Sequence, residues 1–212
     1  MQSNITAPEG APSRTASPGF VARWRVVDII VASVIGVAAG VIYWAYGLAW
    51  ENLSTGLGLV LPGSTALIAA VWLFAGVLGG LVIRKPGAAL YTETIAAVVS
   101  ALIGTQWGLL TIESGLVQGL GAELVLAIFL YRRWGWPVAM LAGAGAGLAM
   151  AINDLVLWYP GYQTAFQLVY VVAAVIGGAL IAGLLSWFLA RALAATGALN
   201  RFAAGREVAR EV

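Results

Sequence analysis

Residues 59–85, LVLPGSTALIAAVWLFAGVLGGLVIRK, decide the fold class of this chain. From Ala66 to Ile83 the stretch carries no charged side chain, and the basic pair Arg84 and Lys85 follows directly. About 20 apolar residues in a helix, at about 1.5 Å each, span the ~30 Å hydrocarbon core of a bilayer. The stretch therefore predicts a transmembrane helix with a basic loop at its end.

Five further apolar stretches accompany this one, and every basic residue falls on one side of the whole pattern. The eleven Lys and Arg residues precede the first stretch or follow the second, fourth and sixth: Arg14, Arg23, Arg25, Arg84, Lys85, Arg132, Arg133, Arg191, Arg201, Arg206 and Arg210. Short loops rich in Lys and Arg stay in the cytoplasm. We therefore predict an all-α protein of the cell (plasma) membrane, a bundle of six transmembrane helices with both termini cytoplasmic.

The composition excludes a soluble protein. Of the 212 residues, 61% are hydrophobic and 9% charged, and the mean hydropathy is +0.93, whereas about a quarter of the residues of soluble domains are charged. Six spans leave no room for a soluble catalytic domain. The chain has no Cys and no His, which removes disulfides, thiolate chemistry and imidazole metal sites. We predict no metal site and no cofactor.

The hydropathy pattern places the six helices at about 26–46, 59–83, 87–107, 111–131, 137–158 and 165–190. Residues 1–22 are rich in Ser, Thr, Pro and Gly and are expected to form a disordered cytoplasmic tail. We expect residues 23–195 to form the six-helix transmembrane domain and residues 196–212 a cytoplasmic C-terminal tail. The external loop of greatest length, 47–58, is either a lid or an ordinary connection.

Small residues recur four apart on several of the predicted helices, for example Ala32 and Gly36 on the first. This spacing lets transmembrane helices approach closely. Packing within the bundle is the simplest interpretation, and contact with a partner protein is the alternative for the first helix.

Four acidic residues fall in or at the ends of spans: Glu93, Glu113, Glu123 and Asp154. An ionisable side chain at the centre of a span costs about 2.5–3.5 kcal/mol, and such residues by default mark function. The sequence offers no basic residue at the same depth to pair with these acids. Either they recognise a ligand, or they are structural acids that bond to the backbone, to each other or, for Glu113, to a helix end.

Amide and aromatic residues share helix faces with these acids and with small residues. They are Gln118, Trp72, Trp107, Tyr170 and Trp158. Together with the acids they predict an outer-half pocket for a small, flat ligand that is cationic or donates hydrogen bonds. Trp72 either stacks on that ligand or fills space opposite glycines.

Motifs of enzymes and pumps do not occur in the sequence. There is no GxxxxGK[ST] phosphate loop, so the chain has no nucleotide site of its own, and there is no HExxH or GxSxG motif. We therefore predict no catalytic residues and a protein that is not an enzyme.

Three segments resemble a known family. They are WRVVDIIVASVIGVAAGVIYW (24–44), the stretch from Arg84 to Glu123 with its RKPGAAL and VQGLGAE strings, and LAATGALNRFAAGRE (193–207). The chain resembles the YkoE-type S components of energy-coupling-factor (ECF) transporters, which are assigned to thiamine and its hydroxymethylpyrimidine precursor. The resemblance implies a substrate-binding subunit that works with a transmembrane T component and two cytoplasmic ATPases. It also implies that Ala32 and Gly36 lie on the strip that contacts the T component.

We therefore predict the substrate-binding subunit of a vitamin importer that captures thiamine or hydroxymethylpyrimidine. Its predicted binding residues are Glu93, Glu123, Asp154, Gln118, Trp72, Trp107, Tyr170 and Trp158. One alternative is a self-sufficient proton- or cation-coupled carrier in which Glu93 and Glu123 relay protons. A membrane scaffold without a ligand is the other alternative, and it leaves the acids unexplained.

Overall fold

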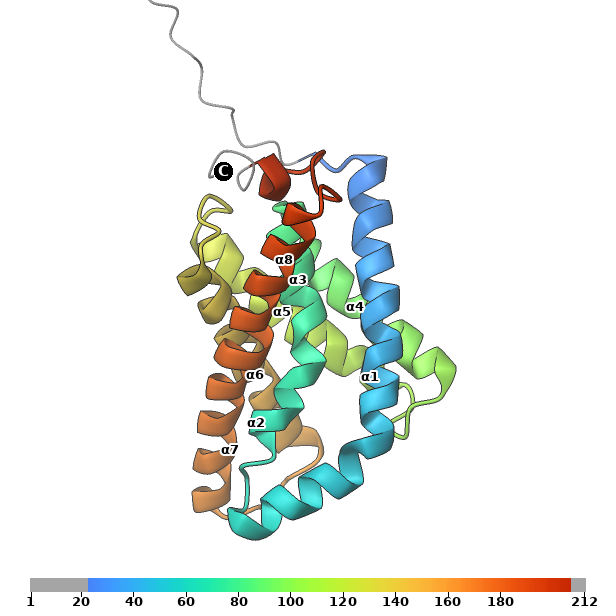
Figure 1. Cartoon of the computed structure of the whole chain (residues 1–212). Helices are drawn as coiled ribbons and strands as arrows, with labels where there is room; N and C mark the ends of the chain where they lie inside the picture. Colours follow the sequence, from blue (N-terminus) through green and yellow to red (C-terminus); the bar gives the residue numbers. More distant parts are fainter. Residues whose placement is uncertain (1–22, 207–212) are drawn as a thin grey trace, which may run out of the picture.

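The computed structural model describes residues 23–206 and shows a bundle of helices (Figure 1). The elements in chain order are α1 (Val26–Val60), α2 (Ala66–Ala69), the 3-10 helix η1 (Ala70–Leu73), α3 (Phe74–Ile83), α4 (Ala88–Ile103), α5 (Leu110–Ile128), α6 (Trp136–Leu157), α7 (Thr164–Gly177), the π-helix η2 (Gly178–Leu184) and α8 (Leu185–Ala195). Both described ends of the chain lie at the same end of the bundle, as the topology predicts. The predicted tail 1–22 lies outside the described residues.

Within residues 23–206, five helical segments are long and apolar enough to cross a membrane: Val26–Val60, Ala66–Ile83, Leu110–Ile128, Trp136–Leu157 and Thr164–Ala195. The remaining predicted span, 87–107, corresponds to α4, which has 16 residues and is a shorter apolar helix. At about 1.5 Å per residue α4 covers roughly 24 Å of the ~30 Å core. The predicted all-helical membrane fold is therefore confirmed, with one span shorter than expected.

The stretch that decides the fold class, 66–83, becomes the central helix of the bundle. Of its 18 residues, 78% are buried inside the protein. In the other four long spans, 33–39% of the residues in an 18-residue window are buried. Glycines let neighbouring helices approach it: a Cβ on Gly80 would lie 2.6 Å from Leu126 Cδ1 of α5, and one on Gly79 would collide with the Thr92 side chain of α4. Close packing of this helix therefore depends on residues without a side chain.

The predicted external loop 47–58 is wrong: these residues are helical and continue α1 to Val60. Figure 1 shows that this part of α1 bends and runs across the end of the bundle opposite the described termini. We call residues 48–60 the outer arm. Trp50 anchors it, because its ring lies 4.7 Å from that of Trp72. The weak helix propensity of the glycines in this segment, about 1 kcal/mol each, does not outweigh these tertiary contacts.

The strip at Ala32 and Gly36 faces inward in the structure, and its contact with a T component stays a prediction. Ala32 is fully buried, and a Cβ on Gly36 would lie 2.7 Å from Ile95 Cγ2 of α4. The side chains that α1 presents outward include Val34 and Val37, which are 62% and 47% exposed. The spacing of four therefore serves packing within this bundle, in the conformation described.

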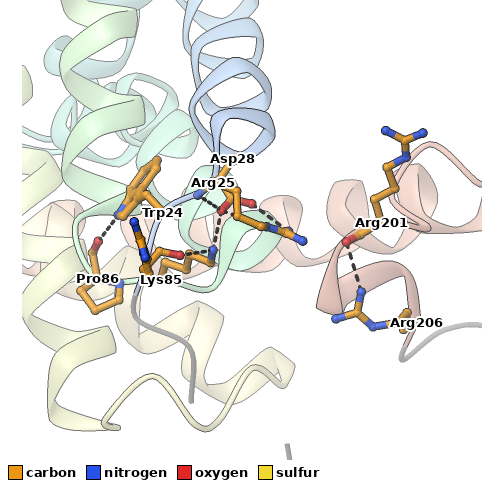
Figure 2. A network of polar contacts seen from close by, with 8 residues as sticks. Trp24, Arg25, Asp28, Lys85, Pro86, Arg201 and Arg206 are labelled. Carbon is orange, nitrogen blue, oxygen red and sulfur yellow. Dashed lines mark hydrogen bonds and ion pairs between the residues drawn. The ribbon is translucent and has the colours of Figure 1, made fainter. Parts of the chain in front are cut away.

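An ion-pair network that the sequence did not reveal closes the inner end of the bundle (Figure 2). The fully buried Asp28 accepts hydrogen bonds from the Arg25 backbone N–H (2.7 Å) and Arg25 Nη2 (2.9 Å), and it pairs with Lys85 Nζ. Lys85 also donates to the Arg23 carbonyl at 2.6 Å, and the Trp24 indole donates to the Pro86 carbonyl at 2.9 Å. The start of α1 is thereby fixed to the α3–α4 connection.

The described part of the predicted C-terminal tail packs against this inner end. Phe202 and Leu199 are 3% and 4% exposed. The Arg25 guanidinium lies 5.8 Å from the centre of the Phe202 ring. Residues up to 206 therefore extend the folded unit beyond α8.

Candidate functional site

A cavity of about 120 Å³ lies among the outer halves of the helices. It is lined from α1, the α2–η1 segment, α4, α5, α6 and α7, and at its outer end by residues of the α4–α5 and α6–α7 connections. Seven of the predicted binding residues line it: Glu93, Asp154, Gln118, Trp72, Trp107, Tyr170 and Trp158. The structure brings together residues from five separate segments of the sequence.

Glu93 is the most deeply buried acid of the cavity, with 1% of its surface exposed. Its Oε2 accepts a hydrogen bond from the Gly76 backbone N–H at 2.6 Å and one from the Tyr43 hydroxyl at 3.2 Å. Tyr43 is held in turn by the Ala75 N–H, which donates to its hydroxyl oxygen at 2.9 Å. The other carboxyl oxygen, Oε1, is buried without a hydrogen-bond partner in the described part of the chain. Glu93 therefore has one fixed oxygen and one that is free to bind.

Two glycines make room for this carboxyl group. A Cβ on Gly76 of α3 would lie 3.1 Å from Glu93 Oε2, and one on Gly119 of α5 would lie 3.0 Å from Glu93 Cβ. Both distances are tighter than ordinary van der Waals contact. The glycines on the faces of α3 and α5 thus allow an acid to fit where three helices meet.

Asp154 lies at the other side of the cavity, near the outer end of α6. Its Oδ2 accepts a hydrogen bond of 2.7 Å from the Tyr170 hydroxyl of α7. The Tyr170 ring is packed 5.1 Å from the Tyr159 ring and 5.7 Å from Phe166. Burial and the neighbouring Asp154 raise the pKa of Tyr159, which lies in the α6–α7 connection. Aromatic packing therefore orients this carboxylate.

Trp72 faces the cavity and also packs within the bundle, and its stacking on a ligand stays a prediction. It lines the cavity, and its ring also packs against Trp50 (4.7 Å), Tyr46 (4.9 Å) and Trp107 (5.0 Å). Its indole N–H donates to the Tyr43 carbonyl at 3.1 Å. The rings form one aromatic wall that joins α1, η1 and the α4–α5 connection.

Glu123 is the predicted binding residue that the structure does not bring to this cavity. Its carboxylate accepts hydrogen bonds from the backbone N–H groups of Gly87 (2.6 Å), Ala89 (2.9 Å) and Leu90 (3.3 Å). The Tyr131 hydroxyl donates a fourth at 2.7 Å, and burial raises the pKa of this tyrosine, which keeps it protonated. A carboxylate at a helix N-terminus bonds free N–H groups and complements the helix dipole. Glu123 caps α4.

Several lining residues were missed by reasoning from the sequence, among them Tyr43, Ser100, Thr111 and Ser114. Thr111 is the most informative, because its buried Oγ1 has no hydrogen-bond partner within residues 23–206. A signal was available: Thr111 precedes Gln118 by seven residues, which places both on one face of the helix.

The cavity is acidic. Glu93 and Asp154 line it, and no lining residue is Lys or Arg. Within residues 23–206 no group of three or more His, Cys, Asp or Glu side chains is placed to hold a metal ion. Carboxylates, hydroxyls and aromatic faces without a basic side chain suit a ligand that donates hydrogen bonds or carries positive charge.

The fold and this cavity define a multi-pass membrane protein that binds a small solute inside its helix bundle. Residues 27–149 match a family described as "ABC-type cobalt transport system, permease component". The chain is similar to "Putative HMP/thiamine permease protein YkoE" of Bacillus subtilis (strain 168), with 41% identity over 194 residues, 87% of this chain and 92% of the relative. A solved structure, "Crystal structure of an S-component of ECF transporter", superposes with a TM-score of 0.81 at 37% identity and covers 89% of this chain and 95% of that chain.

The chain belongs to the family of these relatives. It is a YkoE-like S component of an ECF transporter. The resemblance inferred from its sequence segments is confirmed. It is a transport subunit of a non-enzymatic family, and it resides in the membrane as a multi-pass protein.

Proposed function

We propose that this S component captures thiamine or its hydroxymethylpyrimidine precursor in the cavity and works with a T component and two cytoplasmic ATPases. The free, buried Oε1 of Glu93 is the observation that carries this proposal. The aminopyrimidine common to both compounds has an exocyclic amino group whose N–H can donate to such an oxygen. An unpartnered buried acceptor costs about 1–3 kcal/mol, and a matching donor on the ligand recovers it.

Charge and shape support the same ligands. A planar aminopyrimidine fits between aromatic side chains such as Trp72 and Tyr170, which line the cavity. The thiazolium of thiamine carries a fixed positive charge, which Asp154 and the negative faces of the aromatic rings attract. The name of the relative from Bacillus subtilis points to the same two compounds.

The alternative of a self-sufficient proton-coupled carrier loses its main support. It requires Glu93 and Glu123 to pass protons between them, yet the carboxylate of Glu123 already accepts four hydrogen bonds at the start of α4. The two acids therefore do different work, and we infer that energy for uptake comes from the ATPases.

Titration of the purified, folded subunit with thiamine and with hydroxymethylpyrimidine tests the proposal. Glu93→Gln keeps the size of the side chain and replaces one carboxyl oxygen by an amide NH₂ that cannot accept a hydrogen bond. A buried donor of the ligand left unpaired costs about 1–3 kcal/mol, which corresponds to about a five- to hundredfold loss of affinity. Glu51→Gln, on the exposed outer arm, is the matched control and should bind like the parent. If the parent binds neither compound, or if Glu93→Gln binds both within about twofold of the parent, the proposal is wrong.

A further inference from the structure

Thr111 and Glu93 carry the two buried side-chain atoms without a hydrogen-bond partner in residues 23–206, and both residues line the same cavity. Glu93 has an evident task under the proposed function, whereas Thr111 has none so far. A buried hydroxyl without a partner costs free energy that a methyl group of the same shape would avoid. A ligand atom that bonds to it would remove that cost.

The packing of α4 on α5 sets how far apart these two residues lie. A Cβ on Gly119 would lie 3.0 Å from Glu93 Cβ, so Gly119 and Glu93 are at the same depth. One turn further out, a Cβ on Gly115 would collide with Ala97. Gly115 and Ala97 are therefore also at the same depth. Thr111 precedes Gly119 by eight residues, which is about 12 Å along the helix at 1.5 Å per residue. Thr111 therefore lies at the outer end of the cavity and Glu93 at its deep end.

A ligand that bonds to both residues has to be elongated. Two hydrogen bonds of about 2.8 Å cover less than half of the ~12 Å separation. The ligand's own two polar groups must therefore be several ångströms apart. In hydroxymethylpyrimidine the amino and hydroxymethyl groups are on neighbouring ring atoms, whereas in thiamine the hydroxyethyl group is on the second ring, at the far end from the aminopyrimidine.

We infer that Thr111 is a second recognition residue of the site, and that it bonds to the terminal hydroxyl of a two-ring ligand whose aminopyrimidine is bound by Glu93. This inference rests on the proposed function and makes it more specific, because it assigns the site a preference for thiamine over hydroxymethylpyrimidine. Gln118 and Ser114 lie between the two ends on the same face of α5 and line the path that the ligand follows.

The size of the cavity adds a condition. A cavity of about 150 Å³ takes up benzene, and the present one has about 120 Å³, which is room for one ring. A second ring therefore requires the outer end to widen. Trp50, on the outer arm, is one of the lining side chains whose movement would widen the cavity.

The test uses the full-length purified subunit and isothermal titration with thiamine and, separately, hydroxymethylpyrimidine. Thr111→Val replaces the hydroxyl by a methyl group. We expect its affinity for thiamine to fall about three- to tenfold, the range for one neutral hydrogen bond, while its affinity for hydroxymethylpyrimidine stays within about twofold. Thr111→Ser keeps the hydroxyl and should bind both compounds like the parent.

Thr94→Val is the matched control. The Thr94 hydroxyl donates to the Leu90 carbonyl of its own helix at 2.7 Å, and Thr94 does not line the cavity. This variant should leave both affinities unchanged. Thermal unfolding without ligand provides a second readout: because the Thr111 hydroxyl has no partner, Thr111→Val should not lower the unfolding midpoint.

Equal thiamine affinity of Thr111→Val and the parent overturns the inference and leaves the proposed function standing. An equal loss for both compounds also overturns it, because Thr111 would then shape the cavity rather than contact the second ring. A parent that binds neither compound overturns the proposed function together with this inference.

Discussion

Gly36→Leu tests whether the small-residue strip of α1 packs within the subunit. A Cβ at this position would lie 2.7 Å from Ile95 Cγ2, 2.8 Å from Ile95 Cβ and 3.0 Å from the Thr92 carbonyl oxygen. Ile95 is β-branched and stiff at χ1, and the third atom belongs to the backbone, so neither neighbour can turn away. Overpacking costs about 1–3 kcal/mol, and the four added carbons place this variant near ~3 kcal/mol. Better helix propensity than Gly returns about 1 kcal/mol, which leaves about 2 kcal/mol of destabilisation.

The assay is thermal unfolding of the purified subunit in detergent. For a chain of this size a loss of about 2 kcal/mol lowers the midpoint by roughly 4–8 °C. Ala38→Leu is the control, because Ala38 lies on the exposed face of α1 and its replacement adds bulk without a collision. An unchanged midpoint for Gly36→Leu, combined with loss of the T component from the purified complex, would refute the reasoning and would place the strip at the partner interface.

Three further variants separate binding from stability. Gly76→Ala brings a methyl group to 3.1 Å from Glu93 Oε2, so the carboxyl group has to shift. Titration should then show at least a threefold loss of thiamine affinity. Unchanged affinity would mean that this oxygen is mobile. Glu123→Gln removes the charge of the α4 cap and should lower the unfolding midpoint, at a cost of about 1 kcal/mol. Its thiamine affinity should stay within twofold of the parent. A tenfold loss of thiamine affinity would instead make Glu123 a binding residue. Lys85→Met leaves Asp28 fully buried with only Arg25 as its partner, and should cost up to about 3 kcal/mol in chemical unfolding; stability equal to the parent would contradict the role of the inner network.

Hydropathy and charge predicted the helices because a bilayer imposes one length and one side for basic loops, and both can be counted in a sequence. The outer arm was missed for a related reason. Its glycines and its position between two apolar stretches are typical of a loop, whereas its helical state depends on Trp50 reaching Trp72 across the bundle. Such a contact links residues that no local pattern connects.

The inner network shows the same limit more sharply. Asp28 and Lys85 are separated by 57 positions in the sequence. Lys85 belongs to a basic loop that the positive-inside rule fully explains, so nothing in the sequence required a second role for it. Only the packing of α1 beside the α3–α4 connection shows that Asp28 is buried and has to be paired.

The acids Glu93 and Glu123 show why the residues that line a cavity can be predicted only in part. Each is an acid within an apolar helix, and nothing in the sequence separates them. What separates them is the number of donors that the fold supplies: Glu123 receives three backbone N–H groups because α4 begins beside it, and a tyrosine hydroxyl completes the set. Glu93 lies in the middle of α4, where the N–H groups of its own helix are already bonded.

The donors of Glu93 come instead from Gly76 of the central helix and Tyr43 of α1, and they reach only one of its oxygens. Gly76 and Gly119 bring three helices close around the carboxyl group of Glu93, a residue that is 1% exposed, yet the same close packing offers it too few hydrogen-bond donors. A polar group that is buried and half satisfied favours any solute that supplies the missing donor. Under the proposed function, the tight packing of the bundle and the binding of its ligand therefore have one physical origin.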